Sequence, residues 1–165
     1  MGFFRKKDYM SRSFDQIDKR ILDELQNNGR LSIVELANRV HLTKTPCSER
    51  VKRLEKTGVI KGYRAVVDAT KVGINHVTIV HVSLVQTSDN SLDDFNVAIK
   101  DIPEVQSCLM IAGQFDYMLK VCTRDITHFR ELLGERISKL PGVMQTHSFA
   151  VMETVKETSW IQMTD

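Results

Sequence analysis

The densest positive charge in the chain lies in residues 43–64, where seven Lys and Arg residues stand against two Glu residues. At about 100° per residue, the apolar side chains of Cys47, Val51 and Leu54 fall on one side of a helix. The charged side chains fall on the other side, and they are Glu49, Lys52, Arg53 and Lys56. This spacing predicts an amphipathic helix with a cationic outer face.

The two ends of this helix carry their own signals. Thr43 is expected to be the N-cap and to accept hydrogen bonds from the first turn, while Pro46 lies where a missing N–H costs no helical bond. Gly58 is expected to end the helix in the left-handed conformation. A basic helix face alone is weak evidence for nucleic-acid binding, because most such faces are simply solvated.

The segments before this helix make the pattern more specific. Ser32 and Glu35 have the spacing of a capping box, which predicts a short helix followed by a turn at residues 41–43. Asp15 is expected to cap an earlier helix that ends at Gly29. A short helix, a tight turn and a cationic helix form a helix-turn-helix, whose second helix is shaped to enter a DNA major groove.

The outer face of the cationic helix contains the candidate DNA contacts. Near its N-terminal end, Thr45, Ser48 and Glu49 can reach base edges, whereas the cationic side chains further along can neutralise phosphates. Glu49 could instead pair with a neighbouring Lys or Arg. Arg50 lies at the flank, so a contact with the DNA backbone and an internal ion pair are both open. The candidate partners for that ion pair are Asp23 and Glu24.

Charge is divided unequally along the chain. Residues 1–68 carry 15 basic and 9 acidic side chains, a net charge of +6, whereas residues 69–165 carry 8 and 12, a net charge of −4. The first part is therefore expected to bind a polyanion and the second part to do something else. Residues 59–68 are rich in β-branched side chains, and they are predicted to form a β-wing beside the helix-turn-helix.

Several classes of protein are disfavoured by composition. The three cysteines include no CxxC pair, and the five histidines show no ligand spacing on one helix face, so no disulfide framework or metal site is predicted. No apolar run approaches the roughly 20 residues of a membrane helix, and no signal peptide is predicted. We therefore expect a cytoplasmic protein that associates with no membrane.

The second half predicts two β-α-β units in tandem. Strands are expected at residues 76–85, 105–112, 116–123 and 143–151. One helix is expected to start at Ser91, and Phe129 and Leu132 lie on the apolar face of another. Residues 140–143 repeat the pattern of residues 102–105 at an offset of 38 residues. The predicted fold of this half is a ferredoxin-like βαββαβ domain, so the fold class of the whole chain is α+β.

A sheet with helices on one face only must find cover for its other face. The first strand is apolar on both faces, with Val77 and Ile79 on one and Val80 and Val82 on the other. We therefore expect a homo-oligomer in which two sheets pack face to face. A two-fold dimer would also place two recognition helices one or more helical turns of ~34 Å apart.

The predicted organisation begins with a basic tail over residues 1–12, which could touch the DNA backbone or have no role. A winged helix-turn-helix domain follows over residues 13–68 and a linker over residues 69–75. The ferredoxin-like domain covers residues 76–157, and residues 158–165 are expected to be a C-terminal tail.

Three stretches in this order, TPCSERVKRLEKTGVIKGY, AGQFDYMLKV and LPGV followed by VMETVKE, closely resemble the Lrp/AsnC family of bacterial and archaeal transcription regulators. The resemblance covers residues 14–157. It implies a DNA-binding domain joined by a hinge strand to an effector-binding domain, with dimers that often assemble into octamers. The chain looks most like regulators of the leucine-responsive and proline-catabolism-activator kind, which implies a free amino acid, leucine or proline, as the effector.

The resemblance also assigns roles to individual residues. The DNA contacts that it implies are Thr43, Thr45, Pro46, Ser48, Glu49, Arg50, Lys52 and Arg53. The position of Lys56 on the cationic helix face adds it to these candidates. The effector pocket that it implies lies near Gly113, Gln114, Phe115, Asp116 and Tyr117, with Thr146 to Phe149 of the last strand. Residues 146–150 depart from those of relatives, which leaves the identity of the effector open.

The residues of the 113–117 loop can also be explained without a ligand. Gly113 is expected to supply a positive φ and to let a ligand approach the backbone. Asp116 could hold an ammonium group or could only cap the hairpin. Tyr117 could wall the pocket or pack across strands.

The function predicted from these residues is that of a DNA-binding regulator of amino-acid metabolism genes. An enzyme is not expected, because no set of Ser, Cys, His and carboxylate side chains is spaced as catalysis would require. RNA binding would need a pair of stacking aromatic residues, which the strands lack. A stand-alone small-molecule sensor would not explain the basic half. The alternative is an architectural DNA-binding protein that responds to no effector.

Overall fold

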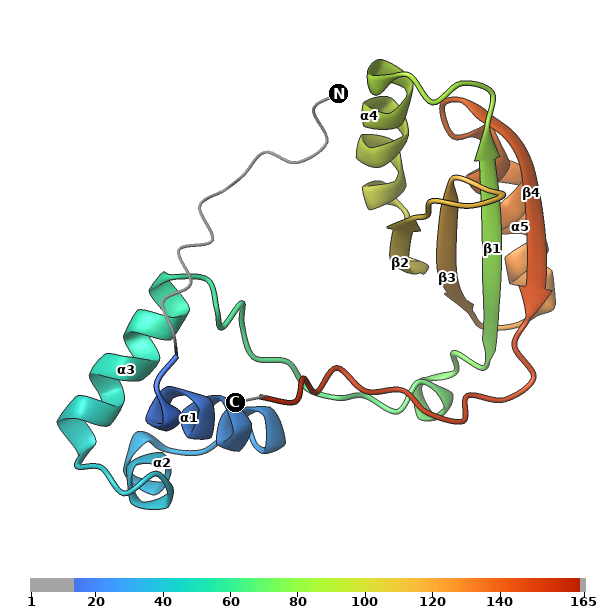
Figure 1. The fold of residues 1–165 in the computed structure, drawn as a ribbon. Helices are drawn as coiled ribbons and strands as arrows, with labels where there is room; N and C mark the ends of the chain where they lie inside the picture. The colour runs from blue at the N-terminus through green and yellow to red at the C-terminus, as the bar shows by residue number, and fades with distance from the viewer. Residues whose placement is uncertain (1–13, 164–165) are drawn as a thin grey trace. The chain divides into compact units, whose positions relative to one another are not determined.

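A computed structural model of the chain describes residues 14–163 (Figure 1). They form two compact units, of which the second is Val67–Lys156 and the first consists of the chain before and after it. The chain therefore passes between the units twice. The basic tail predicted over residues 1–12 lies outside the described residues. The described part of the predicted tail at residues 158–165 is not separate, because it belongs to the first unit.

The first unit contains three helices, α1 (Gln16–Asn27), α2 (Ile33–Arg39) and α3 (Lys44–Lys56). Two predicted N-caps are confirmed. The side chain of Asp15 accepts a hydrogen bond from Asp18 N at 2.8 Å. In the capping box of α2, Ser32 N donates to Glu35 Oε2 at 2.9 Å and Glu35 N donates to Ser32 Oγ at 3.2 Å. Local polar contacts thus fix where the first two helices begin.

The ends of α3 agree only in part with the prediction. Thr43 is the N-cap residue, but its side chain makes no capping hydrogen bond, so its expected role as an acceptor is wrong. Gly58 has a φ of 74°, which confirms the left-handed stop. In the turn before α3, His41 also has a positive φ, 57°, a conformation that few residues with a side chain adopt.

The three helices bury one apolar cluster between them. Its fully buried members are Ile21, Leu22, Leu36, Ala37, Val40, Cys47, Val51 and Leu54. The strand predicted over residues 59–68 is wrong, because these residues contain no strand. A strand exists only where a neighbouring segment supplies hydrogen-bond partners, and none pairs with this one among the described residues. The helix-turn-helix is confirmed, while its wing has no strand ladder.

The second unit is a four-stranded antiparallel sheet with two main helices. Its strands are β1 (His76–Leu84), β2 (Val105–Met110), β3 (Tyr117–Thr123) and β4 (Val143–Ala150). Their order across the sheet is β2-β3-β1-β4. The helices are α4 (Asp89–Ala98) and α5 (Ile126–Glu135). The βαββαβ order is therefore confirmed, although α4 begins before Ser91 with Ser88 as its N-cap.

The two faces of this sheet differ in burial. Thr78, Val80, Val82 and Leu84 of β1 are buried in the core that α4 and α5 share with the sheet. The alternating residues of β1 are only partly buried, since they point to the other face. That second face, which we call the open face, carries Val77, Ile79 and His81 of β1 with their cross-strand neighbours on β3 and β4. Within the second unit, both helices pack on the inner face and no described helix or strand covers the open face (Figure 1).

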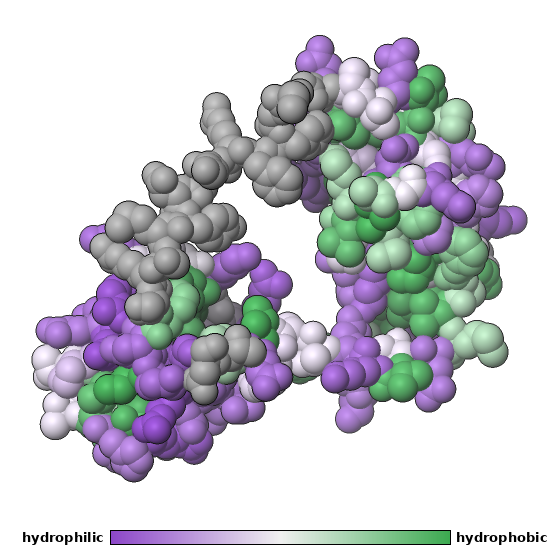
Figure 2. Space-filling model, in the orientation of Figure 1, coloured by the Kyte–Doolittle hydropathy of each residue, from purple (hydrophilic) through white to green (hydrophobic). Residues whose placement is uncertain are grey.

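The surfaces of the two units also differ in hydropathy. The visible side of the first unit is mainly hydrophilic, whereas hydrophobic areas are broader on the visible side of the second unit (Figure 2). None of the helices in the described residues is long and apolar enough to cross a membrane.

Candidate functional site

The outer face of α3 is exposed and carries charges that are not used inside the unit. We call Lys44, Lys52 and Lys56 the free lysines, because each is exposed and none forms an ion pair within residues 14–163. Glu49 is likewise exposed and forms no ion pair in that range, so the predicted pairing with Lys52 or Arg53 does not occur. Thr45 is exposed at the first turn, and Pro46 and Ser48 are partly buried beside it.

Two arginines of α3 turn towards α1 instead. Arg50 Nη1 lies 2.6 Å from Asp15 Oδ2 and 2.8 Å from Asp18 Oδ1, while Arg53 Nη2 lies 2.5 Å from Asp18 Oδ2. Of the two alternatives for Arg50, the internal ion pair therefore occurs, but with Asp15 and Asp18 rather than with Asp23 or Glu24. These ion pairs fix the orientation of α3 against α1 within the first unit.

The electrostatic consequence is clearest at the N-cap of α1. The Asp18 N–H that donates to Asp15 lowers the pKa of the Asp15 carboxyl group, and the nearby Arg50 guanidinium lowers it further. The hydrogen bond to Asp15 is also the largest cause that raises the pKa of Arg50. Asp18 is 4% exposed, so its carboxylate is stable there only because both of its oxygens are paired.

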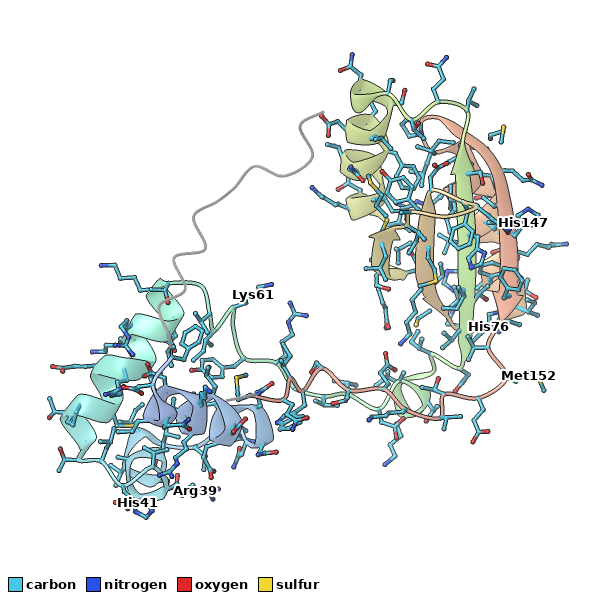
Figure 3. The ribbon with its side chains drawn as sticks, viewed as in Figure 1. Arg39, His41, Lys61, His76, His147 and Met152 are labelled. Atoms are coloured by element: carbon cyan, nitrogen blue, oxygen red, sulfur yellow. The ribbon has the colours of Figure 1, made fainter. Side chains whose placement is uncertain are left out.

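A second charged group joins α2 to α1. Arg39 Nη1 pairs with Glu24 Oε2 at 2.8 Å, and both side chains are partly exposed. With Arg20, Asp23 and His41 they line a hollow of about 370 Å³. Arg39 and His41 lie close together at this end of the unit (Figure 3). One oxygen of Asp23, Oδ1, is buried there without a hydrogen-bond partner.

The predicted effector loop is held tightly at its C-terminal end. Asp116 N donates to Val82 O at 2.9 Å, and Ile111 N donates to Asp116 O at 2.8 Å. Asp116 Oδ2 accepts a hydrogen bond from Leu84 N at 2.7 Å. The carboxylate therefore caps the end of β1, as one of the two readings from the sequence had it. Its other oxygen forms no hydrogen bond within the described residues.

Gly113 and Gln114 lie at the exposed tip of this loop. Gly113 does not have a positive φ, so that part of the prediction is wrong. A side chain at this position would touch only Ile111 Cγ2, at 3.5 Å from its Cβ. The glycine therefore leaves space at the loop tip, rather than making an otherwise forbidden turn possible.

The remaining predicted effector residues fall on two faces of the sheet. Tyr117 is buried and packs on Phe95 of α4 with ring centroids 4.4 Å apart, so its reading as a packing residue is the one observed. Burial is the largest cause that raises the pKa of its hydroxyl group. Thr146 is in register with Val82 and shares that inner face. Phe149 is opposite Ile79 and lies on the open face.

The structure adds an aromatic cluster that the sequence reading missed. The ring of His81 stacks on Phe115 with centroids 3.6 Å apart, and it also contacts Phe149 at 4.8 Å. His147, whose position on β4 is labelled in Figure 3, is the direct cross-strand partner of His81. The alternation of apolar and polar residues in β1 could have placed His81 on the open face. The contact with Phe115 could not be foreseen, because it depends on how the loop folds back.

No group of three or more metal-binding side chains comes together in the part of the chain that the structure describes. Each part of the chain matches a different family of domains. Winged helix-turn-helix DNA-binding domains match residues 14–61, and Lrp/AsnC ligand binding domains match residues 77–161. The two matches thus cover the three-helix region and the sheet region in turn.

Individual proteins match over nearly the full length. The chain is 49% identical over 144 residues to a proline dehydrogenase transcriptional activator of Rhizobium radiobacter, a match that covers 87% of this chain and 92% of the relative. It is 43% identical over 151 residues to a leucine-responsive regulatory protein of Haemophilus influenzae, which covers 92% and 91%. It also resembles the structure of a Neisseria meningitidis transcriptional regulator in complex with L-methionine. That match has a TM-score of 0.83 and 32% identity, over 90% of this chain and 96% of the other.

Proposed function

The chain belongs to the Lrp/AsnC family of DNA-binding transcription regulators, and we infer its mechanism from that membership. The chain is a regulator and not an enzyme. We propose that α3 enters the DNA major groove, that two or more copies assemble through the open face, and that a free amino acid binds between copies. The observation that carries the proposal is the cationic outer face of α3, whose free lysines are exposed and form no ion pair within residues 14–163.

The division of cations on α3 suggests different roles for them. Lys52 and Lys56 are available to contact phosphates, and Lys44 lies at the start of the helix. Arg53 is 48% exposed in its side chain, so it can contact a phosphate while it stays near Asp18. Arg50 is more enclosed and binds two carboxylates, which supports a role in positioning α3 rather than in contacting DNA. Thr43, Thr45, Pro46, Ser48 and Glu49 lie at or near the first turn, the part of a recognition helix that reaches base edges.

The DNA-binding proposal is tested with Lys52→Ala. Each phosphate contact that is lost should make the slope of log K against log salt shallower by about 0.9. We expect weaker binding to all duplex sequences and a slope reduced by about one unit. Lys100→Ala in the second unit is the matched control, because Lys100 is exposed and lies outside the helix-turn-helix. An unchanged slope for Lys52→Ala, measured by fluorescence anisotropy, would remove Lys52 from the interface.

The open face supports self-association. Ile79 is partly buried while Phe149 is 51% exposed, and Leu109 on the edge strand β2 is 50% exposed. Packing two such faces together would remove this apolar area from water. A two-fold dimer would present two copies of α3 to two half-sites. Assembly beyond the dimer, to an octamer, is part of the proposal, and a mass measurement in solution tests it.

The effector site is proposed at the 113–117 loop together with β4. The loop tip is exposed, the free oxygen of Asp116 is available for an ammonium group, and Phe149 supplies an apolar contact. Gln114, Tyr117 and Thr146 are included because the family resemblance places them there. A ligand bound between two copies would be enclosed by residues of both, including residues that are exposed in a single copy. Leucine, proline and methionine are the candidates, the last because L-methionine is bound in the Neisseria regulator.

A thermal-shift screen against the twenty amino acids identifies the effector. A ligand at 100 times its dissociation constant stabilises the folded protein by about 2.7 kcal/mol. Asp116→Asn is the informative variant, because an amide oxygen can still accept from Leu84 N while the charge is lost. We expect Asp116→Asn to keep DNA binding and lose the shift. No shift with any amino acid in the wild type would favour an effector-independent DNA-binding protein.

An effector can regulate only if it binds one assembly more tightly than another. We propose that the amino acid changes the arrangement or number of assembled copies, and thereby the spacing of the α3 helices that meet the DNA. Such a regulator would act on the nucleoid in the cytoplasm. Footprinting with and without the amino acid should show a changed pattern of protection, and identical patterns would contradict this mechanism.

A further inference from the structure

Two segments of the first unit that lead to the second unit are held at the end of α1, one by Gln26 and the other by Gly29, just after the helix. On the way out, Tyr63 lies against Gly29, where an added Cβ would come within 3.3 Å of Tyr63 Cδ1. The Tyr63 hydroxyl group donates to Glu55 Oε1 at 3.0 Å, which holds the segment to α3 as well. On the way back, residues 157–163 belong to the first unit, and we call them the docked segment.

The docked segment is attached by a paired contact. Gln26 Nε2 donates to Ile161 O at 3.0 Å, and Ile161 N donates to Gln26 Oε1 at 2.7 Å. One side-chain amide thus satisfies both backbone groups of one residue, in the way that two paired strands do. Two residues later, Met163 packs against the apolar cluster of the three helices. A polar contact and an apolar contact therefore set the register of the segment on α1.

The same contacts are easily broken. Ile161 is 66% exposed and Trp160 is 43% exposed, so the segment lies on the surface and buries little area. Water competes for exposed hydrogen bonds, which lowers their net contribution. Covalent attachment through residues 151–156 compensates, because a short tether keeps the segment at an effective concentration on the order of millimolar. Release of the docked segment would therefore break few contacts of the first unit.

The short connection also links the segment to the proposed effector region. Val151 N donates to Val77 O at 2.9 Å, so the chain is still fixed to the sheet one residue after β4. Residues 152–160 separate that point from Ile161, the residue that Gln26 holds. The strand β4, which carries Thr146 and Phe149, therefore continues through this stretch of chain into the contact with Gln26.

We propose that the docked segment is a second, releasable connection between the DNA-binding unit and the effector unit, and that the effector acts on DNA binding partly through its attachment to Gln26. The connection through Tyr63 is permanent, whereas the one through Ile161 opens and closes. With both closed, the DNA-binding unit has less freedom to move. The regulatory half of this inference rests on the proposed function, whereas the docking half does not.

Hydrogen exchange in the full-length protein tests the docking. Gln26→Ala removes both hydrogen bonds, and we expect the Ile161 amide to exchange at least ten times faster than in the wild type. Asn27→Ala is the matched control, because Asn27 is the exposed neighbour of Gln26 on the same helix. Gln26→Glu keeps an acceptor for Ile161 N and should give an intermediate rate. Equal rates in the wild type and Gln26→Ala would overturn the proposal.

Operator binding with and without amino acid tests the regulatory half. In Gln26→Ala we expect the affinity without effector to stay within twofold of the wild type, since Gln26 lies on α1 and its side-chain hydrogen bonds go to Ile161 rather than to α3. The ratio of affinities with and without effector should fall at least threefold towards one. An unchanged ratio in a variant whose segment is shown by exchange to be released would overturn the coupling. If the wild type itself showed no response, the proposed effector function would fail, while the exchange experiment would still decide the docking.

Discussion

The two units expose opposite kinds of surface. The first unit closes its apolar core and leaves cations outside, with the free lysines along α3. The second unit closes only one side of its sheet and leaves apolar side chains such as Phe149 on the other. Binding through charge weakens as salt rises, whereas binding through apolar area does not. The comparison therefore predicts a polyanion as the partner of the first unit and a protein surface as the partner of the second.

The largest effect is expected from a charge on the open face. Ile79→Asp should weaken self-association about a hundredfold or more, equivalent to about 2.7 kcal/mol, because a carboxylate would have to lose its hydration at the interface where the wild type buries an apolar side chain. Val97→Asp is the control, since Val97 is 64% exposed on α4. Analytical ultracentrifugation should find smaller assemblies for Ile79→Asp only. Equal masses for both variants would mean that the open face is not the interface.

A smaller effect is expected from a change at Asp18, the buried carboxylate that pairs with two arginines of α3. Asp18→Asn removes the carboxylate that pairs with Arg53 and one of the two carboxylates that pair with Arg50. Removing one member of a fully buried pair costs about 3–5 kcal/mol, and the partial exposure of the two arginines reduces this to about 1–3 kcal/mol. Glu24→Gln, which breaks an exposed pair with Arg39, should cost less than about 1 kcal/mol. Urea unfolding measures both, and equal losses would contradict the distinction between inner and outer charges.

Acid should weaken both units through their N-caps. Asp15 in the first unit and Asp125 in the second each have a pKa below the ordinary value of 3.8. The largest cause is a backbone N–H donor, from Asp18 for Asp15 and from His128 for Asp125. A carboxyl group with a lowered pKa contributes stability that is complete above pH 3.8 and is lost as the pH falls through the lower folded value. In Asp15→Asn, unfolding measured between pH 5 and pH 2 should depend less steeply on pH than in the wild type.

The smallest effect is expected at Tyr63. Its pKa is raised to about 12, first by burial and then by its hydrogen bond to Glu55. A raised pKa of this acid means that its contribution is complete below pH 10 and is lost as the pH rises towards 12. Tyr63→Phe should lose about 0.5–1 kcal/mol at neutral pH. It should also lose stability less steeply above pH 10, which circular dichroism at fixed urea concentration can measure.

The sequence predicted regular elements well because each is specified by nearby residues. The caps at Asp15 and Ser32, the stop at Gly58 and the apolar spacing in α3 are all local patterns. The strand expected over residues 59–68 failed for the complementary reason. High β-propensity is not enough for a strand when no second segment provides hydrogen-bond partners.

The candidate site was predicted less completely than the fold, since its geometry depends on contacts distant in sequence. The spacing in α3 identified Arg50 and Arg53 as cationic, but only the packing of α1 on α3 revealed that Asp15 and Asp18 neutralise them. In the same way, the loop sequence could not tell that Asp116 reaches Leu84 or that Phe115 reaches His81. Nor did any pattern in residues 157–163 predict the contact with Gln26.

The strand order of the sheet has a consequence for how fast each part of the chain can fold. The three helices are adjacent in sequence and make mostly local contacts, which favours rapid folding. β1 lies between β3 and β4, and its residue Val82 pairs with Thr146, far along the chain. The chain must lose the conformational entropy of closing that long loop before the strand pairing contributes any stability. The helical part should therefore form early, while the sheet remains incomplete until its last strand has joined.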